Sequence, residues 1–326
     1  MSGGPLASGG PLASGGPLVR PLVLAAGLGE RLRPLTLTLP KPLVPVCGRP
    51  VVEPLLEMLA AVGLHDVAIN RHWLPEVLHD HLGDGAAWGV RLHWRHEPEL
   101  LEGAGTLKSF EDFLGEATAL VVNGDCVLDV DLPAAVAAHH AAGNLVTLVC
   151  APVLGPLARP VAFDESGRVW GLRRHGLDDP RGTQRAEFIG VHLVEPEVWR
   201  RHIPRGRPCN LVGQVIPRLL ARGLPVGVHL DAGLFCDIGN PASLERAALL
   251  VLDRRPPRYL SRAVETSFGV WCEPGAQLLG DARPPVYLGA GAVVEAGARL
   301  GPYAVLTAGG RLPSGACLAY GVSAGV

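Results

Sequence analysis

The stretch LAAGLGERLRPLTLTLPKPLVPVCGRP, residues 24–50, decides the fold of this chain. It continues the short apolar run Pro21–Ala26, which is typical of a buried parallel strand that ends in glycine-rich sequence. Glycines directly after a strand let backbone N–H groups approach a phosphate closely, and we expect Gly27 and Gly29 to do so. Arg31 adds a guanidinium fork that fits phosphate oxygens.

Lys41 lies between two prolines in the same stretch, so we expect a stiff loop that presents its ammonium group from a fixed place. The chain has 27 arginines and only two lysines, Lys41 and Lys108, which favours a functional role for Lys41 over an ordinary loop position. The rival interpretation of the two glycines is a nicotinamide dinucleotide site. That motif needs a third glycine, which is missing, and an acidic residue where Asn70 stands.

Two aspartates come directly after apolar strand patterns. The strand 119–122 leads through Asn-Gly to Asp125, at the end of a strand where α/β proteins bind their ligands. Asp237 precedes a helix that is predicted to begin with Asn240 as its cap. Two carboxylates, phosphate oxygens and waters form a usual shell for Mg²⁺, although each aspartate taken alone fits a structural turn or cap better.

Strands and helices alternate along the first half of the chain at the spacing of a doubly wound α/β sheet. The expected strands are 21–26, 66–70, 91–96, 119–122, 145–150, 187–193 and 226–230, with a hairpin over 161–172. The expected helices are 53–61, 75–82, 106–114 and 132–140, and one that follows Asn240. We therefore predict a Rossmann-like, mixed and mainly parallel sheet.

An apolar residue recurs every six positions near the C-terminus: Leu288, Val294, Leu300, Leu306, Leu312 and Leu318. One apolar and one small residue per six is how a β-solenoid fills a narrow triangular interior. We expect a short left-handed parallel β-helix over 256–326, a larger domain over 19–255 and a disordered low-complexity leader over 1–18. Charge is scarce in 286–326, so we expect these coils to contact another subunit in a homo-oligomer, with a regulatory lid over the larger domain's site as the alternative.

Composition excludes several classes of protein. The chain has 29 basic and 31 acidic residues among 326, which lacks the basic footprint of a nucleic-acid-binding protein. It has no apolar run of about 18 residues that would span a membrane. The seven cysteines form no C-x-x-C pair, which disfavours a disulfide framework or a zinc site and favours the reducing cytoplasm.

Residues 24–50 resemble the sugar-1-phosphate nucleotidyltransferases, enzymes that make nucleotide sugars. This segment matches the family pattern L-A-A-G-x-G-x-R-L-x-P-L-T…P-K-P-L-x-P-V-x-G-x-P. Two further family motifs follow in the right order, N-G-D at residues 123–125 and D-I-G-x-P at residues 237–241. The resemblance covers residues 20–255 and implies that a nucleoside triphosphate and a sugar 1-phosphate give an NDP-sugar and pyrophosphate, with Mg²⁺. The sugar phosphate attacks the α-phosphate in line, so no protein nucleophile is needed.

The resemblance also implies roles for individual residues. Arg31 and Lys41 would neutralise the phosphates, while Asp125 and Asp237 would hold Mg²⁺. The implied nucleotide-binding residues are Leu24, Ala25, Ala26, Gly27, Gly29, Glu30, Gly103, Gly105, Asn123 and Gly124.

The sugar side departs from the family pattern. The E-K-P motif, whose lysine contacts the sugar phosphate in many members, is missing, and we expect Arg173 and Arg174, or alternatively Arg185, to substitute for it. Glu187 and Gly190, in a strand that resembles the family's sugar-side strand, are the other expected sugar-phosphate-binding residues. A surface carboxylate is an equal alternative for Glu187.

The nucleobase and the sugar stay open. The C-terminal repeats resemble those of mannose-1-phosphate guanylyltransferases, which favours GTP with mannose 1-phosphate or a related sugar. Segments 69–85 and 101–108 instead resemble the N-acetylmuramate-1-phosphate uridylyltransferase branch, so a uridylyltransferase acting on a hexose or N-acetylated amino-sugar 1-phosphate is the alternative. A catalytically silent, regulatory homologue that binds nucleotide sugars is the alternative outside the enzymes.

Overall fold

The computed structural model describes residues 18–152, 160–172, 176–177 and 179–325. The chain divides into two compact units, and each is built from segments that are distant in sequence. Unit 1 comprises residues 1–28, 56–124 and 128–235, and unit 2 comprises residues 29–55, 125–127 and 236–326. The boundaries expected after residues 18 and 255 remain predictions.

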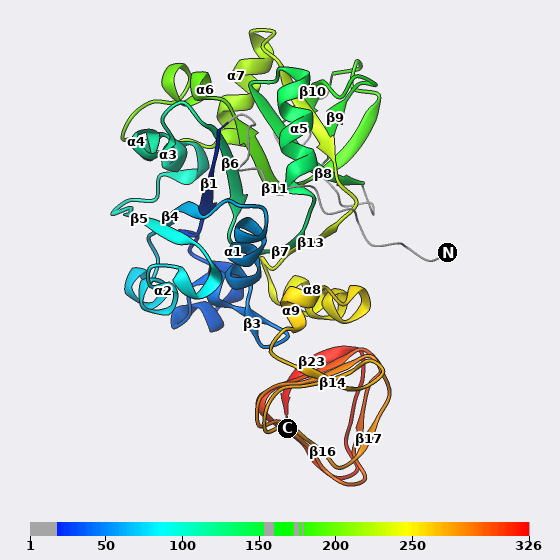
Figure 1. The fold of residues 1–326 in the computed structure, drawn as a ribbon. Helices are drawn as coiled ribbons and strands as arrows, with labels where there is room; N and C mark the ends of the chain where they lie inside the picture. The colour runs from blue at the N-terminus through cyan, green and yellow to red at the C-terminus, as the bar shows by residue number, and fades with distance from the viewer. Residues whose placement is uncertain (1–17, 153–159, 173–175, 178, 326) are drawn as a thin grey trace. The chain divides into compact units, whose positions relative to one another are not determined.

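Unit 1 is built on a nine-stranded mixed sheet (Figure 1). The strands are β1 Val19–Leu24, β4 Asp66–Arg71, β5 Arg91–His96, β6 Thr118–Asn123, β8 Val146–Pro152, β9 Val161–Phe163, β10 Val169–Leu172, β11 Gln184–Val194 and β12 Val226–Leu230. They run in the order β10-β9-β11-β6-β1-β4-β5, and β8 pairs with β11 and β12. The pairs β1–β4, β1–β6, β4–β5 and β8–β12 are parallel, whereas β11 is antiparallel to each of its neighbours. The predicted mixed sheet is confirmed.

The helices of unit 1 follow the apolar periodicity of the sequence. They are α2 Pro75–Leu82, α3 Glu102–Ser109, α4 Glu111–Leu114, α5 Leu132–Ala142, α6 Pro196–Arg201 and α7 Ile216–Ala221, while α1 Val52–Ala61 crosses the boundary between the units. Asp131 caps α5 through a hydrogen bond from the backbone N–H of Ala134, at 2.9 Å. The helix expected over 106–114 begins earlier and breaks at Phe110, whose backbone leaves the helical region.

The core of unit 1 lies between the sheet and these helices. Its largest members, Trp199 and Phe110, are fully buried together with strand residues such as Leu22 and Leu148. Helix α5 packs on β8 and β12, and α7 packs on β10 and β12. Burial of both faces explains why the central strands are continuous apolar runs.

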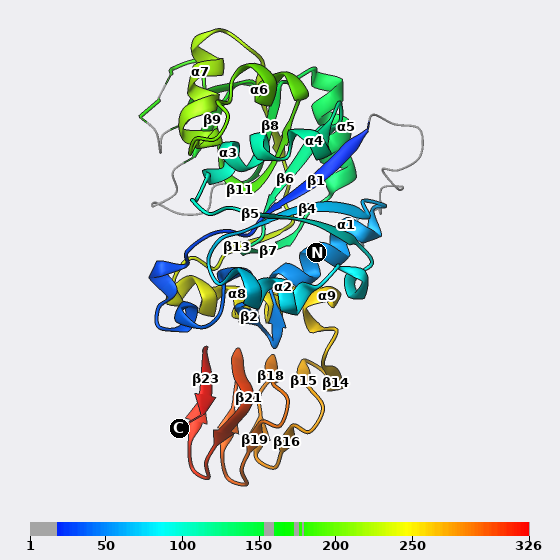
Figure 2. The ribbon, with the colours of Figure 1, turned by 90° about the vertical axis from the view of Figure 1, so that its left-hand side faces the viewer.

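The C-terminal part of unit 2 stacks short parallel strands around a narrow apolar core (Figures 1 and 2). Strands β15 Val270–Cys272, β18 Val286–Leu288, β21 Ala304–Leu312 and β23 Gly321–Gly325 lie side by side. The other strands there are β14 Val264–Ser267, β16 Gln277–Leu278, β17 Asp281–Ala282, β19 Val293–Val294, β20 Arg299–Leu300 and β22 Cys317–Leu318. Leu288 pairs with Leu306 and Leu300 with Leu318, so residues three hexads apart lie in register.

The rest of unit 2 contains the loops that follow the first strand. Short helical turns cover η1 Glu30–Leu32, η2 Leu35–Leu37 and η3 Lys41–Leu43, and β2 Pro45–Val46 pairs with β3 Arg49–Pro50. Helix α8 Pro241–Arg254 is followed by α9 Pro257–Leu260. As predicted, Asn240 caps α8, in a reciprocal capping box with Ser243. The pair β7 Cys126–Asp129 and β13 Leu234–Asp237 forms a separate ribbon.

The turn between β2 and β3 rests on the stacked strands of the same unit. Cys47 and Gly48 both adopt positive φ angles, of 45° and 70°. A Cβ atom at Gly48 would collide with the carboxylate of Glu273, which accepts hydrogen bonds from Tyr287 and from the backbone N–H of Ala290. Only glycine fits this close approach.

None of the described helices is long and apolar enough to cross a membrane.

Candidate functional site

Three of the four predicted catalytic residues come together in unit 2. Nζ of Lys41 lies 2.5 Å from Oδ2 of Asp125 and 3.2 Å from Oδ1 of Asp237. Lys41 opens the turn η3 with Pro40 as its cap, Asp125 immediately precedes β7, and Asp237 ends β13. The fold thus gathers one ammonium and two carboxylate groups from segments 84 and 196 positions apart.

Arg31 lies beside the same cluster. A Cβ atom at Gly239 would lie 2.7 Å from Nη2 of Arg31 and 2.6 Å from Oδ2 of Asp237. Both side chains therefore occupy the space that a side chain at position 239 would need. Arg31 is exposed, so its guanidinium group is accessible to an anion.

Lys41 is almost completely buried, with 6% of its surface exposed. Burial lowers the pKa of an ammonium group, but the charges of Asp125 and Asp237 and the hydrogen bond to Asp125 outweigh it, so the pKa of Lys41 lies above its ordinary value. Lys41 therefore stays a cation across the physiological range of pH.

The carboxylates of Asp125 and Asp237 fit a hard divalent cation. Their oxygens and Sγ of Cys126 all lie within 4.8 Å of one another, and the Asp125 and Asp237 side chains are 27% and 46% exposed. Ionised carboxylates only accept hydrogen bonds and are the usual protein ligands of such cations. Burial, followed by the charges of Asp125 and Asp237, raises the pKa of Cys126 well above its ordinary value, so Cys126 is a neutral thiol.

The glycine-rich loop begins unit 2 with a left-handed residue. Gly29 has φ 65°, and a Cβ atom there would lie 2.9 Å from Cγ2 of Thr36 and 3.4 Å from Cβ of Lys41. Thr36 is buried and donates a hydrogen bond of 2.7 Å to the carbonyl oxygen of Gly29. Gly29 therefore lets the loop fold tightly over the segment that leads to Lys41. Glu30, the next residue, is exposed.

The expected nucleotide-binding residues of unit 1 lie at the ends of β1 and β6. Leu24 accepts a 2.9 Å hydrogen bond from the N–H of Gly124. Ala25 and Ala26 are buried, and the N–H of Ala25 donates to Oδ1 of Asn70 at 2.7 Å. The N–H of Ala25 is therefore engaged within the protein.

Gly27 stands out among the residues of this loop. It is exposed, and a Cβ atom built there would meet nothing within 4 Å. Its backbone can therefore be approached closely from solvent.

A buried polar network that sequence reasoning missed supports the end of β1. Nδ2 of Asn70 donates to Oε1 of Glu97 at 2.9 Å and to Oγ1 of Thr106 at 3.1 Å, and Thr106 also donates to Glu97 at 2.6 Å. The other oxygen of Glu97 accepts from the N–H of Leu101. In the sequence, Asn70 only argues against a dinucleotide site, whereas in the structure it links the end of β1 to Thr106 within α3.

Gly103 and Gly105, the expected residues near the base, both lie in α3. A Cβ atom at Gly105 would lie 2.8 Å from the carbonyl oxygen of Arg207, and the N–H groups of Ala104 and Gly105 both donate to the carbonyl of Cys209. Gly105 is therefore a packing glycine that lets α3 approach the 207–209 segment. Gly103 faces a cavity.

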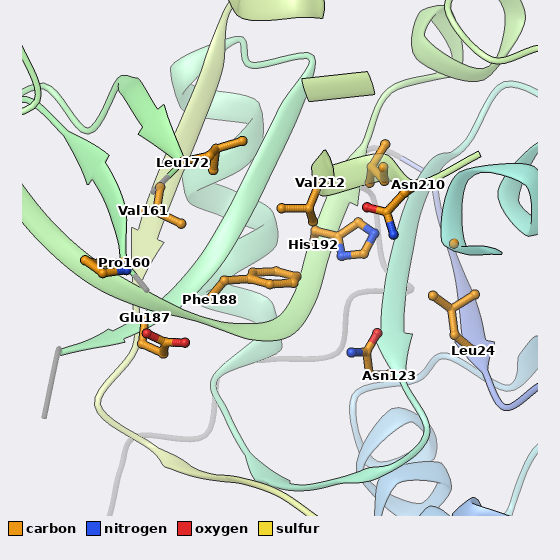
Figure 3. A pocket seen from close by; sticks show the side chains of 12 residues that line it. Leu24, Asn123, Pro160, Val161, Leu172, Glu187, Phe188, His192, Asn210 and Val212 are labelled. Carbon is orange, nitrogen blue, oxygen red and sulfur yellow. The ribbon is translucent and has the colours of Figure 1, made fainter. Parts of the chain in front are cut away.

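That cavity has a volume of about 330 Å³ and lies within unit 1 (Figure 3). Four of the expected site residues line it: Leu24, Gly103, Asn123 and Glu187. The other lining residues are Pro160, Val161, Leu172, Phe188, His192, Asn210, Leu211 and Val212. The lining therefore contains a few polar side chains among mostly apolar ones, which is the usual character of a small-molecule site.

A bulge in β11 shapes one side of the cavity. Phe188 pairs with Cys150, but the next pair along the strand is Val191 with Val149, so the register shifts at Gly190. Gly190 has φ 80°, and a Cβ atom there would lie 2.9 Å from Nδ2 of Asn123. Glu187 and Phe188 both line the cavity, and the bulge follows them along β11.

His192 was not singled out in the sequence, where the histidines form no set with metal-ligand spacing. It is buried, 4% exposed, and its ring centre lies 5.7 Å from that of Phe188. Neither ring nitrogen has a hydrogen-bond partner within the described ranges of the chain. Burial lowers its pKa to about 3, so the imidazole is neutral.

The two arginines that were expected to contact the sugar phosphate, Arg173 and Arg174, lie outside the described residues.

Comparisons with known proteins agree with this architecture. The family described as Nucleotidyl transferase matches residues 20–173. An N-acetylmuramate alpha-1-phosphate uridylyltransferase from Neisseria meningitidis serogroup B is 44% identical over 71% of this chain and 98% of that protein. A mannose-1-phosphate guanylyltransferase from Mycobacterium tuberculosis is 32% identical over 86% of this chain and 76% of that protein.

A solved structure from Bacillus anthracis, assigned as a glucose-1-phosphate thymidylyltransferase, shares the fold. Its TM-score is 0.61, at 22% identity, over 71% of this chain and 94% of that one. The mixed sheet, the glycine-rich loop and these relatives define a nucleotidyltransferase, so the protein is an enzyme. The chain belongs to the sugar-1-phosphate nucleotidyltransferase family.

Proposed function

We propose that this enzyme couples a nucleoside triphosphate to a sugar 1-phosphate and releases pyrophosphate. The observation that carries the proposal is the cluster of Lys41, Asp125 and Asp237, with Arg31 beside it. An ionised sugar phosphate is already a nucleophile, so the protein must position it and neutralise the charge that builds up on the triphosphate.

Arg31 and Lys41 are proposed to pair with the phosphate oxygens. The buried ammonium group of Lys41 is held charged by two carboxylates, and the exposed guanidinium group of Arg31 offers several donors. Asp125 and Asp237 are proposed to hold Mg²⁺, which when bound would neutralise phosphate charge. The partial exposure of these two side chains supports that assignment.

The nucleotide is proposed to meet the loop after β1 and the cavity edge. Gly27 supports this role because its Cα is open to solvent, and Gly29 because its positive φ angle turns the chain toward Arg31. The full proposed set is Leu24, Ala25, Ala26, Gly27, Gly29, Glu30, Gly103, Gly105, Asn123 and Gly124. Ala25 and Gly105 contribute through packing, since the backbone N–H group of each donates to another part of the protein.

The sugar phosphate is proposed to bind in the cavity of unit 1. Glu187 lines it and Gly190 adjoins Asn123, which also lines it. Arg173 and Arg174 are proposed to replace the missing lysine of the E-K-P motif. A carboxylate beside amide groups suits sugar hydroxyls, which both donate and accept hydrogen bonds.

Two substrate pairs are proposed. GTP with mannose 1-phosphate or a related sugar is supported by the relative from Mycobacterium tuberculosis, which aligns over 86% of this chain. UTP with a hexose or N-acetylated amino-sugar 1-phosphate is supported by the 44% identical relative from Neisseria meningitidis. A UTP–glucose-1-phosphate uridylyltransferase from Synechocystis, 29% identical over 86% of this chain, adds support to the second pair.

We further propose that residues 256–326 form a left-handed β-helix of hexapeptide repeats and contribute to a homo-oligomer. The in-register pairing of residues three hexads apart supports the coil. Phe268, Leu279 and Tyr320 are large hydrophobic side chains that are more than half exposed on these strands and loops, which suits a contact with a second subunit. A cytoplasmic location agrees with seven cysteines that form no disulfide in the structure.

The decisive experiment is pyrophosphate release with Mg²⁺ across five nucleoside triphosphates and a panel of hexose and amino-sugar 1-phosphates. Release that requires one base and one sugar phosphate would establish the reaction and both substrates. An Asp125→Asn variant that folds but loses turnover is expected to accompany it, whereas full activity in that variant would remove the metal assignment. No release from any pair would contradict the proposed function.

A further inference from the structure

His192 is a buried polar side chain that faces the cavity of unit 1. It lies on β11, four residues after Phe188, and Figure 3 shows its imidazole ring among the labelled lining residues Asn123, Asn210 and Val212. Only 4% of its surface is exposed, and both ring nitrogens lack a hydrogen-bond partner within the described part of the chain. Buried polar groups in folded proteins are nearly always paired, so this pair of nitrogens calls for a partner that the described part of the chain does not supply.

The chemistry of the ring limits what that partner is. Burial keeps the imidazole neutral, so one nitrogen donates a hydrogen bond and the other accepts one. A hydroxyl group also donates and accepts, and so it matches either nitrogen. The carboxylate of Glu187 lines the same cavity and supplies a further acceptor for hydroxyl groups.

The other lining side chains suit a sugar ring. Leu172, Phe188 and Val212 give the cavity an apolar wall, against which the carbon skeleton of a pyranose packs while its hydroxyls reach polar groups at the rim. Oδ1 of Asn210 is already committed to capping the next helical turn through the N–H of Gly213, at 2.7 Å. His192 is thus a polar group on this wall whose two ring nitrogens both have open hydrogen-bonding capacity within the described part of the chain.

We propose that His192 is a specificity-determining residue that hydrogen-bonds one ring hydroxyl of the sugar 1-phosphate. This inference rests on the proposed function, since it names which group of the cavity reads the sugar. His192 does not take part in the chemical step, because the reacting phosphates carry the nucleophile and the leaving group. Its loss therefore acts on recognition of the sugar and leaves recognition of the nucleoside triphosphate unchanged.

The test combines variants of His192 with sugar 1-phosphates that lack single hydroxyls. His192→Phe removes both nitrogens, His192→Asn keeps an amide near the position of Nδ1, and His202→Phe is a control outside the cavity lining. For the wild type, removal of the hydroxyl that meets His192 is expected to lower kcat/KM roughly 10- to 100-fold. In His192→Phe the parent sugar suffers this loss, and the deoxy sugar suffers no further loss.

Binding of ligands without turnover supplies a second readout. By calorimetry, the affinity of the NDP-sugar is expected to fall in His192→Phe, while the affinity of the nucleoside diphosphate alone stays within about twofold. His192→Asn is expected to recover part of the lost sugar affinity. If His192→Phe does not fold, His192→Asn alone is compared with the wild type. The quantity compared is the loss of kcat/KM for each sugar 1-phosphate that lacks one hydroxyl.

Three results would overturn the inference. One is that removal of each sugar hydroxyl lowers kcat/KM by the same factor in wild type, His192→Phe and His192→Asn. Another is a rise in KM for the nucleoside triphosphate without a change for the sugar, which would assign the cavity to the nucleobase. The third is a loss of kcat with unchanged affinities. A wild type that forms no product from any pair would instead contradict the proposed function itself.

Discussion

Nζ of Lys41 lies 2.5 Å from Oδ2 of Asp125, although 84 positions separate the two residues in the chain. The ammonium group is buried and its pKa is raised by the charges of Asp125 and Asp237, which burial only partly offsets. One fixed cation thus compensates two carboxylates that are otherwise 27% and 46% exposed. In the proposed site, these three groups and Arg31 beside them would set the charge that a triphosphate and its metal ion meet.

Replacement of Lys41 by methionine tests this charge arrangement. The variant keeps the length of the side chain but removes the cation, so we expect kcat to fall by at least about 100-fold because a preorganised charge at the phosphates is lost. The two carboxylates then repel each other. We therefore expect Mg²⁺ to raise the melting temperature of Lys41→Met more than that of the wild type, as measured by differential scanning fluorimetry with and without the ion.

Arg33→Met serves as the control for Lys41→Met. Arg33 is exposed and lies 3.9 Å from Glu30 in a weak surface ion pair, so its removal is expected to change kcat little and to leave the Mg²⁺ effect at its wild-type size. If Mg²⁺ raises the melting temperature of Lys41→Met and of the wild type by the same amount, the carboxylates do not bind the ion.

Gly27→Ala tests whether a phosphate approaches the loop after β1. A Cβ atom at position 27 meets nothing within 4 Å, so the melting temperature is expected to stay near that of the wild type. The added methyl group stands where a bound phosphate would approach the backbone, and we expect KM for the nucleoside triphosphate to rise roughly tenfold. KM for the sugar 1-phosphate is the internal control. An unchanged KM for the triphosphate would remove Gly27 from the nucleotide site.

Most of the fold could be predicted from sequence because apolar periodicity records burial. The helix at Pro75–Leu82 and the strands at Arg91–His96 and Val226–Leu230 have the predicted bounds, since a proline, turn residues or a change of pattern marks each end. The helix predicted over 106–114 was misplaced at its start, because Gly103 and Gly105 look like loop residues. Both belong to α3, where Gly105 packs against the backbone of residue 207.

The charged residues of the site were also accessible from sequence, but its buried polar groups were not. Lys41 and Asp125 stand in motifs that combine a special backbone with a charge, and the fold brings them together. Asn70 and His192 lie within ordinary strand patterns. Asn70 is paired, whereas His192 has no hydrogen-bond partner among the described residues. Which of the two holds depends on neighbours from distant segments that no local pattern records.

Gly190→Ala tests the bulge in β11. The residue needs φ 80°, and its Cβ atom would lie 2.9 Å from the amide of Asn123. Backbone strain and the displacement of Asn123 are together expected to lower the free energy of unfolding by about 2–3 kcal/mol and to raise KM for the sugar 1-phosphate. Urea unfolding and steady-state kinetics measure the two effects.

The matched control for Gly190→Ala is Gly223→Ala. Gly223 also has a positive φ angle, of 69°, but its Cβ atom would meet nothing within 4 Å. It is expected to lose only the backbone component, about 1 kcal/mol, with unchanged KM for both substrates. Equal losses of stability in the two variants would show that Asn123 moves aside at no cost, and that the bulge does not fix its position.

The neutral imidazole of His192 makes a prediction about stability and pH. Burial lowers its pKa to about 3 in the folded protein, while an unfolded histidine has a pKa of about 6.5. Between these values the unfolded chain binds a proton that the folded protein does not, so the stability of the fold declines as pH falls below about 6.5. A single proton contributes about 1.4 kcal/mol per pH unit, or about 2 kcal/mol between pH 7 and pH 5.

His192→Asn removes this titration while it keeps a polar side chain. We expect the free energy of unfolding of the variant to fall less between pH 7 and pH 5 than that of the wild type, by about 2 kcal/mol, as measured by urea unfolding at both values. Other titrating groups are common to both proteins and cancel in the comparison. Parallel losses in wild type and variant would mean that His192 titrates in the folded protein as it does in the unfolded chain, and hence that burial does not keep its imidazole neutral at pH 5.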